Sequence, residues 1–474
     1  MPLGMSEAGE LVVAAGAPLD PTVIDELSWT YDCPVRVTEA PAAEIHAAVM
    51  SAQSDAADDD SKGGDLVVLA EEETTIDDLR ALANQTPVIK LVNLLVLEAL
   101  RARASDIHLE AGDEGLRVRY RIDGVLHDIS HPPRQYQAAV ISRVKIMAGL
   151  NIAERRLAQD GRIRLRLSDR DLDLRVSITP TLHGESVVLR VLDRGTGVRD
   201  LGELGMPTQV LSEFEQLVRQ PHGIILVTGP TGSGKTTTLY GALSRLNQAG
   251  VKIVTVEDPV EYQMSGVSQI PVNAKIGLTF AAALRSILRH DPDIIMVGEM
   301  RDREAAEIAI QAALTGHLVF STLHTNDAAA GVTRMVDMGI ESYLVAATVL
   351  GILAQRLVRM VCEACAEDIE PDDDVLAKVA AGQVDIPSPR FRRGRGCEVC
   401  AGTGYRGRTG LYELMPMRAE LRQAVVERKS LAELRALAER RGTASLRSAG
   451  WAKACAGITT LEEVMRLTRD EVVG

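Results

Sequence analysis

The alternation of apolar and polar residues divides the chain into regions with different predicted secondary structure. Between about 66 and 195, short segments alternate at period two, which is typical of strands with one half-exposed face. The clearest are Leu116–Ile122 and Ile163–Leu167, in which arginines occupy most of the polar positions. Residues Pro87–Leu100 instead place apolar side chains at helical spacing. This region is therefore predicted to be a small α/β domain whose sheet has one basic face.

From about 200 to 357, apolar strands alternate with helical segments, which indicates a mostly parallel sheet flanked by helices. The predicted strands include Ile224–Val227, Lys252–Val256 and Ile294–Val297. From 358 onward, a cysteine-bearing insert and then a helical tail are expected. The apolar residues of this last part fall in three segments, Leu411–Met415, Leu431–Leu437 and Leu461–Leu467.

Composition narrows the possible functions. The chain has 474 residues, 46% hydrophobic and 25% charged, which is ordinary for a folded globular protein and excludes disorder as its main state. A net charge of −14 and an aromatic content of 3% argue against a protein that coats nucleic acid or stacks on its bases. No apolar run approaches the roughly 18 residues of a membrane span, and no secretory signal is expected. Six cysteines in a chain of this length indicate a reducing compartment rather than a disulfide framework.

The strongest motif is GPTGSGKT at Gly229–Thr236, which matches G-x-x-x-x-G-K-[ST] between a predicted strand and a predicted helix. Its glycines let backbone N–H groups turn toward a bound phosphate at a helix N-terminus. Lys235 would reach the β- and γ-phosphates, and the Thr236 hydroxyl would bind Mg²⁺. A chance glycine-rich turn would not require this flanking strand and helix. The predicted nucleotide-binding residues here are Gly229, Pro230, Thr231, Gly232, Ser233, Gly234, Lys235, Thr236 and Thr237.

Acidic residues follow two of the predicted strands. Glu257, Asp258 and Glu261 come after Lys252–Val256, and Glu299 comes after the next strand. Because the carboxyl ends of parallel strands open onto a ligand crevice, these acids are expected beside the phosphate-binding loop. Phosphoryl transfer to water needs a metal-holding acid and a group that orients the water. Acids that cap helices or solvate loops are the alternative, which their order after the motif makes less attractive.

Two histidines, His317 and His324, bracket an apolar strand with Thr, Ser and Asn residues around it. Each could donate to a γ-phosphate oxygen or relay its presence to a neighbouring subunit. A lone histidine in such a place is more often structural, but the polar surroundings favour a sensor loop.

Four cysteines form two C-x-x-C pairs, Cys362 with Cys365 and Cys397 with Cys400. Two such pairs fill a tetrahedral Zn²⁺ site, which would be structural because no coordination position stays open. Free thiols or redox-active pairs are the alternatives. Between the pairs, the basic segment 390–395 could touch an anionic membrane surface or an acidic partner, or could be a solvated loop. Cys33 and Cys455 are expected to be ordinary buried thiols.

Several segments resemble motifs of the secretion and pilus ATPases, in the order of that family. VTVEDPVEY, LRHDPDIIMVGEMRD and TGHLVFSTLHTNDA are similar to its Asp box, atypical Walker B motif and His box. Upstream, ASDIHLE, RVRYRIDGVL, AERRLAQDGRI and HGESVVLRVLDR resemble its second N-terminal domain. The resemblance covers roughly residues 85 to 474.

The resemblance implies an α/β fold with a RecA-like P-loop ATPase core, a preceding small α/β (PAS-like) domain, a zinc-binding insert and a helical C-terminal tail. The implied parts are a short partner-docking domain at 1–53, an acidic linker at 54–82, the PAS-like domain at 83–198, the ATPase core at 199–357, the tetracysteine zinc-binding subdomain at 358–412 and the helical subdomain at 413–474. The linker contains SDAADDDSKGGD, whose charge run is interpreted as a solvated spacer.

The resemblance also implies roles for single residues. Glu261 would be the general base, Glu299 the Walker B acid, and His317 and His324 sensors of the γ-phosphate. Arginines of the second domain would reach the nucleotide as fingers. The candidates are Arg119, Arg121 and Arg134, although the arginines of Leu116–Ile122 also fit the solvent face of a strand.

The implied function is that of a hexameric cytoplasmic ATPase, peripherally associated with the inner membrane. It would hydrolyse ATP with Mg²⁺, contain Zn²⁺, and drive pseudopilus assembly and protein export by type II secretion. Its partners would be other copies of itself and inner-membrane platform proteins, with no nucleic acid. A type IV pilus extension ATPase is a close alternative. A nucleic-acid translocase is disfavoured by the charge, and a non-hydrolysing nucleotide switch by the acids and Lys235.

Overall fold

The computed structural model describes residues 2–6, 10–15, 23–24, 28, 33–41, 66–68, 87–167, 170–193, 198–370 and 389–468. The chain forms two compact units, Met1–Val67 with Leu167–Asp169, and Val68–Arg166 with Arg170–Gly474. The acidic stretch 54–65 lies outside the described residues. No helix among the described residues is both long and apolar enough to cross a bilayer.

The N-terminal unit contains a small three-stranded sheet. Its strands are β1 (Pro2–Met5), β2 (Leu11–Ala15) and β3 (Val35–Glu39), in that order across the sheet. β1 and β2 are antiparallel, whereas β2 and β3 are parallel. A short strand, β4 (Leu66–Val68), contains the point in the sequence where the first unit ends and the second begins.

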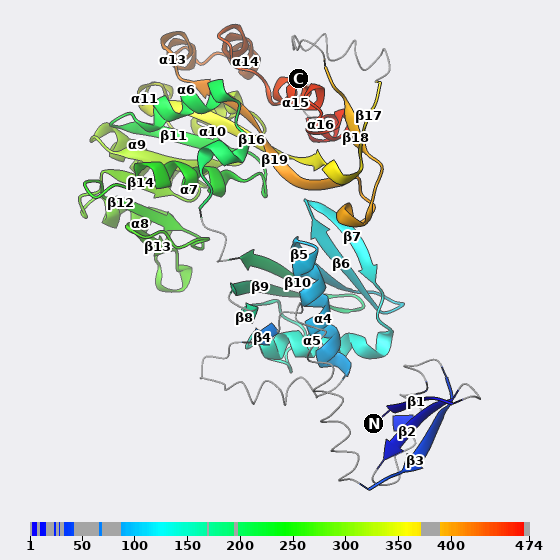
Figure 1. Cartoon of the computed structure of the whole chain (residues 1–474). Helices are drawn as coiled ribbons and strands as arrows, with labels where there is room; N and C mark the ends of the chain where they lie inside the picture. Colours follow the sequence, from blue (N-terminus) through cyan, green and yellow to red (C-terminus); the bar gives the residue numbers. More distant parts are fainter. Residues whose placement is uncertain are drawn as a thin grey trace. The chain divides into compact units, whose positions relative to one another are not determined.

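The second unit begins with the predicted small α/β domain (Figure 1). Its antiparallel strands follow the order β8-β9-β10-β5-β6-β7. Two helices, α4 and α5, contact each other and this sheet. The elements are α4 (Pro87–Arg101), β5 (Ala104–Ala111), β6 (Leu116–Ile122), β7 (Val125–Ser130), α5 (Arg134–Met147), β8 (Gln159–Leu167), β9 (Arg170–Thr181) and β10 (Gly184–Asp193).

The period-two prediction is confirmed in β6, which has the predicted bounds. Leu116, Val118 and Tyr120 are buried, and the Tyr120 hydroxyl donates to the Leu95 carbonyl of α4 at 2.6 Å. The intervening arginines lie on the more exposed face of the sheet. Alternating apolar residues therefore join the sheet to its helices, while the basic face points away from that core.

The core sheet of the second unit follows the order β13-β12-β14-β15-β11-β16-β19. Adjacent strands of this sheet are parallel in every pair except β16 with β19, which are antiparallel. The mostly parallel sheet is thus confirmed. Its strands are β11 (Gly223–Thr228), β12 (Ile253–Glu257), β13 (Val267–Pro271), β14 (Ile294–Val297), β15 (Leu318–Leu323), β16 (Val349–Val361) and β19 (Tyr405–Pro416).

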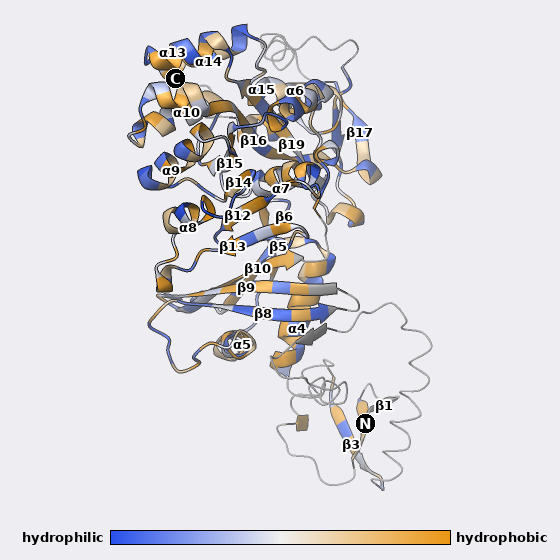
Figure 2. Ribbon diagram, turned by 90° about the vertical axis from the view of Figure 1, so that its left-hand side faces the viewer, coloured by the Kyte–Doolittle hydropathy of each residue, from blue (hydrophilic) through white to orange (hydrophobic). Residues whose placement is uncertain are grey.

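Helices cover both faces of the core sheet. Successive residues of the buried strand β11 point to opposite faces, so that Ile224 and Leu226 pack in one apolar cluster and Ile225 and Val227 in another. The first face carries α8 (Phe280–Ile287), α9 (Arg303–Leu314), α10 (Ala328–Asp337) and α11 (Ser342–Thr348); the second carries η1 (Leu201–Leu204), α6 (Thr208–Val218) and α7 (Lys235–Leu246). Several of these helices show hydrophilic and hydrophobic stripes in Figure 2.

The C-terminal part departs from the sequence prediction at one segment. Leu411–Met415 was grouped with the helical tail but lies in β19, which pairs with β16 as an antiparallel edge of the core sheet. Its run of buried apolar residues is that of a strand covered on both faces, which periodicity alone does not distinguish from a buried helix. The helices begin afterwards, as α13 (Ala419–Val426), α14 (Leu431–Arg440), α15 (Leu446–Cys455) and α16 (Leu461–Leu467).

A buried carboxylate joins α16 to β16. Glu463 is 2% exposed and pairs with Arg359 and Arg466, each at 2.8 Å. The Arg359 guanidinium also lies 4.0 Å from the centre of the Tyr405 ring. Burial opposes ionisation, but the hydrogen bonds and charges of Arg466 and Arg359 outweigh it and lower the pKa of Glu463 to about 2.

This depressed pKa predicts a pH-dependent stability. The ionised pair stabilises the fold at a pH above the unfolded value of 4.5, and this contribution is lost as the pH falls toward 2. We expect Glu463→Gln to lower the free energy of unfolding at neutral pH by about 3 kcal/mol. The difference from wild type should fall to less than half by about pH 3. Denaturant unfolding at several pH values measures this, with Glu462→Gln, at an exposed position, as control. An equal loss of unfolding free energy at neutral pH and at about pH 3 would contradict the prediction.

Candidate functional site

The phosphate-binding motif forms a tight loop between β11 and α7. Gly234 has φ +87° and directly precedes the first residue of α7, a conformation that glycine adopts readily. At Gly229, a Cβ atom would lie 2.3 Å from the Gln355 carbonyl oxygen, so the loop packs closely against β16, the strand adjacent to β11 in the sheet. The Lys235 ammonium donates to the carbonyls of Gly229 and Pro230 at 2.7 and 3.1 Å.

The loop retains the features of an anion site. The Ser233 hydroxyl oxygen is buried and has no hydrogen-bond partner among the described residues. Burial lowers the pKa of Lys235, and the nearby negative charge of Glu299 opposes this shift. An unpartnered hydroxyl, a buried ammonium and the N-terminus of α7 together fit a phosphate group.

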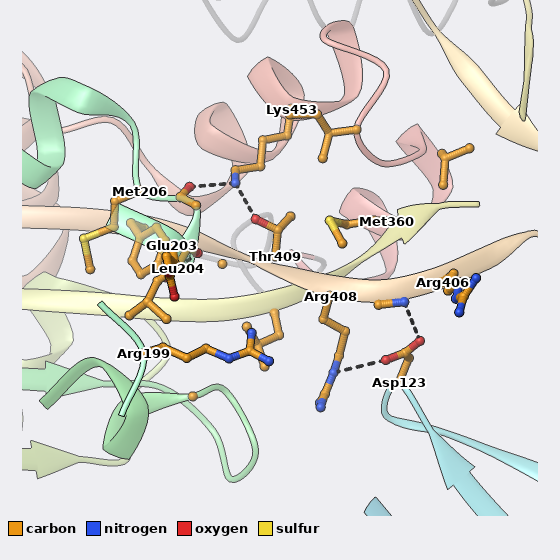
Figure 3. A pocket seen from close by; sticks show the side chains of 18 of the residues that line it. Asp123, Arg199, Glu203, Leu204, Met206, Met360, Arg406, Arg408, Thr409 and Lys453 are labelled. Carbon is orange, nitrogen blue, oxygen red and sulfur yellow. Dashed lines mark hydrogen bonds and ion pairs between the residues drawn. The ribbon is translucent and has the colours of Figure 1, made fainter. Parts of the chain in front are cut away.

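A cavity of about 1630 Å³ reaches the P-loop at Gly234 and Thr237. Another wall contains Gly205, which ends the turn leading from η1 toward α6, and Lys453 of α15 (Figure 3). Lys453 Nζ donates to the Gly205 carbonyl and to Thr409 Oγ1, both at 2.8 Å. Burial lowers the pKa of Lys453 to about 8. The cavity thus has room for the part of a nucleotide that extends beyond its phosphates.

Glu299 lies at the carboxyl end of β14, two strands from the P-loop strand. Its carboxylate contacts Arg301 Nε at 2.8 Å and His324 Nε2 at 3.1 Å. His324 follows β15, the strand between β14 and β11. Burial lowers the pKa of His324, with a smaller contribution from Lys235, so that the ring is neutral at neutral pH. Glu299, His324 and Lys235 therefore form one electrostatically coupled group beside the P-loop.

Glu261 lies in the loop after β12, at the same edge of the sheet. Its carboxylate contacts the guanidinium of Arg175 on β9, with N–O distances of 3.2 and 3.4 Å. Arg175 was missing from the sequence prediction. Its place between Leu174 and Val176, both buried, put it on the polar face of a strand, but nothing local indicated that this strand faces the P-loop edge.

The other acids after β12 differ from each other. Glu257 is 3% exposed and accepts hydrogen bonds from Tyr240, Thr255 and Gln269. Asp258 is exposed, and its charge acts on Arg301. The Glu257 carboxylate is thus hydrogen-bonded within the protein, whereas the Asp258 side chain is exposed.

The predicted arginine fingers lie in the small α/β domain. Arg119 pairs with Glu110, and Arg121 lies 3.8 Å from the buried Asp106 and donates to the Gly124 carbonyl. Arg134 is exposed at the first residue of α5. Arg175, on β9 of the same sheet, is in contact with Glu261.

The two histidines of the predicted sensor loop lie at opposite ends of β15. His317 precedes the strand, and its Nδ1 lies 2.8 Å from the Ala312 carbonyl and 3.1 Å from Thr315 Oγ1. A six-residue strand separates its ends by roughly 20 Å. His324 is therefore at the P-loop edge, and His317 is at the edge that carries the amino ends of the parallel strands.

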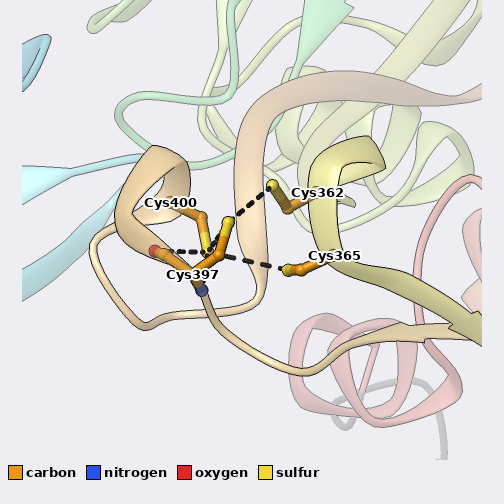
Figure 4. A group of neighbouring side chains, drawn as sticks. All are labelled: Cys362, Cys365, Cys397 and Cys400. Atoms are coloured by element: carbon orange, nitrogen blue, oxygen red, sulfur yellow. Dashed lines mark hydrogen bonds between the residues drawn. The ribbon is translucent and has the colours of Figure 1, made fainter.

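The four predicted cysteine ligands converge (Figure 4). Their sulfurs lie within 4.8 Å of one another, with separations of 3.9, 3.9 and 3.7 Å for three of the pairs. A tetrahedral Zn²⁺ with Zn–S bonds of about 2.3 Å would separate its sulfurs by about 3.8 Å. The cluster can hold such an ion. Of the other two cysteines, Cys455 is buried as expected, but Cys33 is only half-buried.

The arginines of the basic segment between the cysteine pairs form ion pairs with nearby carboxylates. Its four arginines pair with acids on and near the hairpin of β17 (Ala366–Asp368) and β18 (Arg392–Gly394). These pairs are Arg390 with Asp368, Arg392 with Glu363, and Arg393 and Arg395 with Glu367. Phe391 is buried against Trp451 and Cys455. The hairpin is thus anchored to the C-terminal helices, and its positive charge is shared with carboxylates.

The sheet and its P-loop edge define a RecA-like P-loop nucleotide-binding fold. Residues 81–466 match the family described as "Type II/IV secretion system protein", and the chain belongs to this family. It is 54% identical over 395 residues to the type II secretion system protein E of Xanthomonas campestris pv. campestris, with 83% of this chain and 70% of that protein covered.

Other relatives extend the family beyond secretion. The type IV pilus assembly ATPase PilB of Myxococcus xanthus is 49% identical over 405 residues, covering 85% of this chain and 72% of that protein. The crystal structure of the pilus retraction motor PilT with bound ADP has a TM-score of 0.53 and 27% identity, covering 79% of this chain and 95% of PilT. The fold is thus shared by assembly and retraction motors.

Proposed function

We propose that this chain is a protein-secreting ATPase: it hydrolyses Mg-ATP to drive pseudopilus assembly and protein export by a type II secretion system. One observation carries the hydrolytic part. The P-loop, His324, Glu299 and Glu261 follow four strands of one sheet and gather at its carboxyl edge. The secretion part rests on relatives such as the Xanthomonas protein.

In this proposal, Lys235 and the backbone N–H groups of the P-loop bind the β- and γ-phosphates. Thr236 and Glu299 would hold Mg²⁺, which would neutralise charge that develops on the phosphoryl oxygens. Glu261 accepts the proton of the attacking water. His324, in contact with Glu299, responds to the γ-phosphate.

Positive charge from the small α/β domain would complete the site. Arg119, Arg121 and Arg134 remain finger candidates, but the first two would have to leave Glu110 and Asp106 to reach a phosphate. Arg175 already lies beside Glu261.

We also propose a homohexamer that is cytoplasmic, attached peripherally to the inner membrane and in contact with platform proteins there. The cysteine cluster would hold one structural Zn²⁺.

A type IV pilus assembly ATPase is the second candidate, favoured by the 49% identity to PilB of Myxococcus. Both functions use the same hydrolytic site, so activity alone does not separate them. Identification of the membrane proteins that co-purify with the chain would separate them.

Steady-state phosphate release from Mg-ATP over a range of protein concentrations tests the hydrolytic proposal. We expect specific activity to rise with concentration, as an oligomeric site requires, and to fall by at least about 100-fold in Lys235→Ala. Lys252→Ala removes a lysine outside the P-loop and should change little. Activity that survives in Lys235→Ala would show that hydrolysis comes from another site or a contaminant, and would overturn the proposal.

A further inference from the structure

One glutamine side chain holds the loop that carries Glu261. Gln269 on β13 donates from Nε2 to the Tyr262 carbonyl at 2.8 Å, and its Oε1 accepts from the Met264 backbone N–H at 2.8 Å. The same Nε2 lies 3.2 Å from Glu257 Oε1 and 3.2 Å from the Tyr240 hydroxyl. A single amide thus binds both the main chain that follows Glu261 and the strand end that precedes it.

Gln269 belongs to a buried hydrogen-bonded cluster. The Tyr240 hydroxyl and Thr255 Oγ1 donate to the two carboxylate oxygens of Glu257, Thr255 at 2.6 Å. Tyr240 and Glu257 are 1% and 3% exposed, so the carboxylate depends on these donors in place of water. Together with Gln269 they supply three donors to one carboxylate.

Tyr240 connects this cluster to the P-loop. It lies on α7, the helix that begins at Lys235, and its ring packs edge-on against the Tyr262 ring with centres 5.6 Å apart. Burial raises the pKa of Tyr240, and the hydrogen bond to Glu257 adds to this, so the phenol remains a donor. Backbone N–H groups of Tyr262 and Glu261 act in the opposite direction on this pKa. Gln269 Nε2 lies beside this hydroxyl and donates to the Tyr262 carbonyl, which links α7 to the loop after Glu261.

Glu261 has little other support. Arg175 is its side-chain partner among the described residues, and the Glu261 side chain is 31% exposed. Apolar packing of Tyr262 and Met264 against the core holds those side chains but gives no directional contact to the main chain. The hydrogen bonds of Gln269 supply that direction.

We propose that Gln269, through Tyr240 and Glu257, is a positioning residue that fixes the Glu261 loop relative to α7 and thus to the P-loop. This rests on the proposed function, in which Glu261 is the general base. A misplacement of about 1 Å at a reacting group can lower a rate about 100-fold. In this proposal Gln269 acts through the loop, by its hydrogen bonds to the main chain of Tyr262 and Met264.

The test compares full-length wild type, Gln269→Ala and Gln423→Ala, an exposed glutamine on α13 as matched control. We expect Gln269→Ala to lower kcat about 10- to 100-fold, with KM and the affinity for a non-hydrolysable ATP analogue changed less than about two-fold. In a Glu261→Gln background, the same substitution should cause little further loss, because both changes act on one step. A role in folding alone would lower activity equally in both backgrounds.

Several outcomes would overturn the proposal. Three results would each reject the positioning role: a kcat of Gln269→Ala within two-fold of wild type, an effect confined to KM, or an equal fractional loss of kcat with and without Glu261. The proposed function would still stand as long as the wild type shows turnover that depends on Lys235. Wild type without such turnover rejects both. If Gln269→Ala does not fold, Tyr240→Phe replaces it: the ring contact to Tyr262 is kept, the hydroxyl is lost, and the same kcat loss and the same dependence on Glu261 are required.

Discussion

Glu261→Gln should lower the rate of ATP hydrolysis about 1,000-fold while leaving nucleotide affinity close to that of wild type. The amide has the shape of the carboxylate but cannot take up the proton of the attacking water, and general-base catalysis typically contributes 10²- to 10⁴-fold. Glu261 lies outside the P-loop, so the groups that bind phosphate remain. The loss should therefore appear in kcat and not in KM.

Single-turnover hydrolysis with enzyme in excess over ATP measures this change, because it reports the chemical step separately from product release. Glu304→Gln is a suitable control: Glu304 is an exposed carboxylate that pairs with Arg285 on the same unit, and its loss should leave the rate within two-fold. Retention of more than a tenth of the wild-type rate in Glu261→Gln would remove Glu261 from the role of base. Asp258, the exposed acid of the same loop, would then be the next candidate.

Local patterns were sufficient for the parts of the fold whose signals lie within a few residues. The β6 bounds, the buried strand β14 and the start of the helix at Lys235 follow from alternation, a short apolar run and a glycine-rich turn. Glu299 was placed at the ligand edge by a rule of topology, because parallel strands present their carboxyl ends together. His324 was assigned to a sensor loop from its polar surroundings and from the family resemblance. The structure brings these two side chains to 3.1 Å.

Contacts between distant segments were beyond local patterns. The pairing of Arg175 with Glu261 joins residues 86 positions apart, and no feature of either segment specifies the other. The strand that contains Leu411–Met415 was missed because its hydrogen-bonding partner, β16, begins some 60 residues earlier. Its apolar residues are buried in the clusters on the two faces of the sheet. Both histidines were assigned as γ-phosphate sensors from their polar surroundings and the family resemblance, and the structure places them at opposite ends of β15.

Removal of metal from the cysteine cluster should have the second large effect, on stability. The cluster joins Cys362 to Cys397 and Cys365 to Cys400, each pair 35 positions apart in the chain. Structural Zn²⁺ sites contribute on the order of 10 kcal/mol to folding, and this chain has no disulfide among the described residues to replace it. We expect one zinc per chain in freshly purified protein, and a Tm lowered by ten degrees or more in Cys397→Ser or after chelation.

The loss of stability should reach the core sheet, because the cysteine cluster adjoins the antiparallel strands β16 and β19 at its edge. Cys362 directly follows β16, and its backbone N–H donates to the Gly404 carbonyl at 2.9 Å. Gly404 is the residue immediately before β19. Metal analysis and thermal unfolding test this, with Cys455→Ser, a buried cysteine outside the cluster, as the matched control. Protein that contains no zinc when purified, or whose Tm does not respond to Cys397→Ser, would show that thiol packing alone maintains this edge. A fall in Tm in Cys397→Ser but not in Cys455→Ser would instead make the metal a structural support of β16 and β19, the strand pair at the edge of the core sheet.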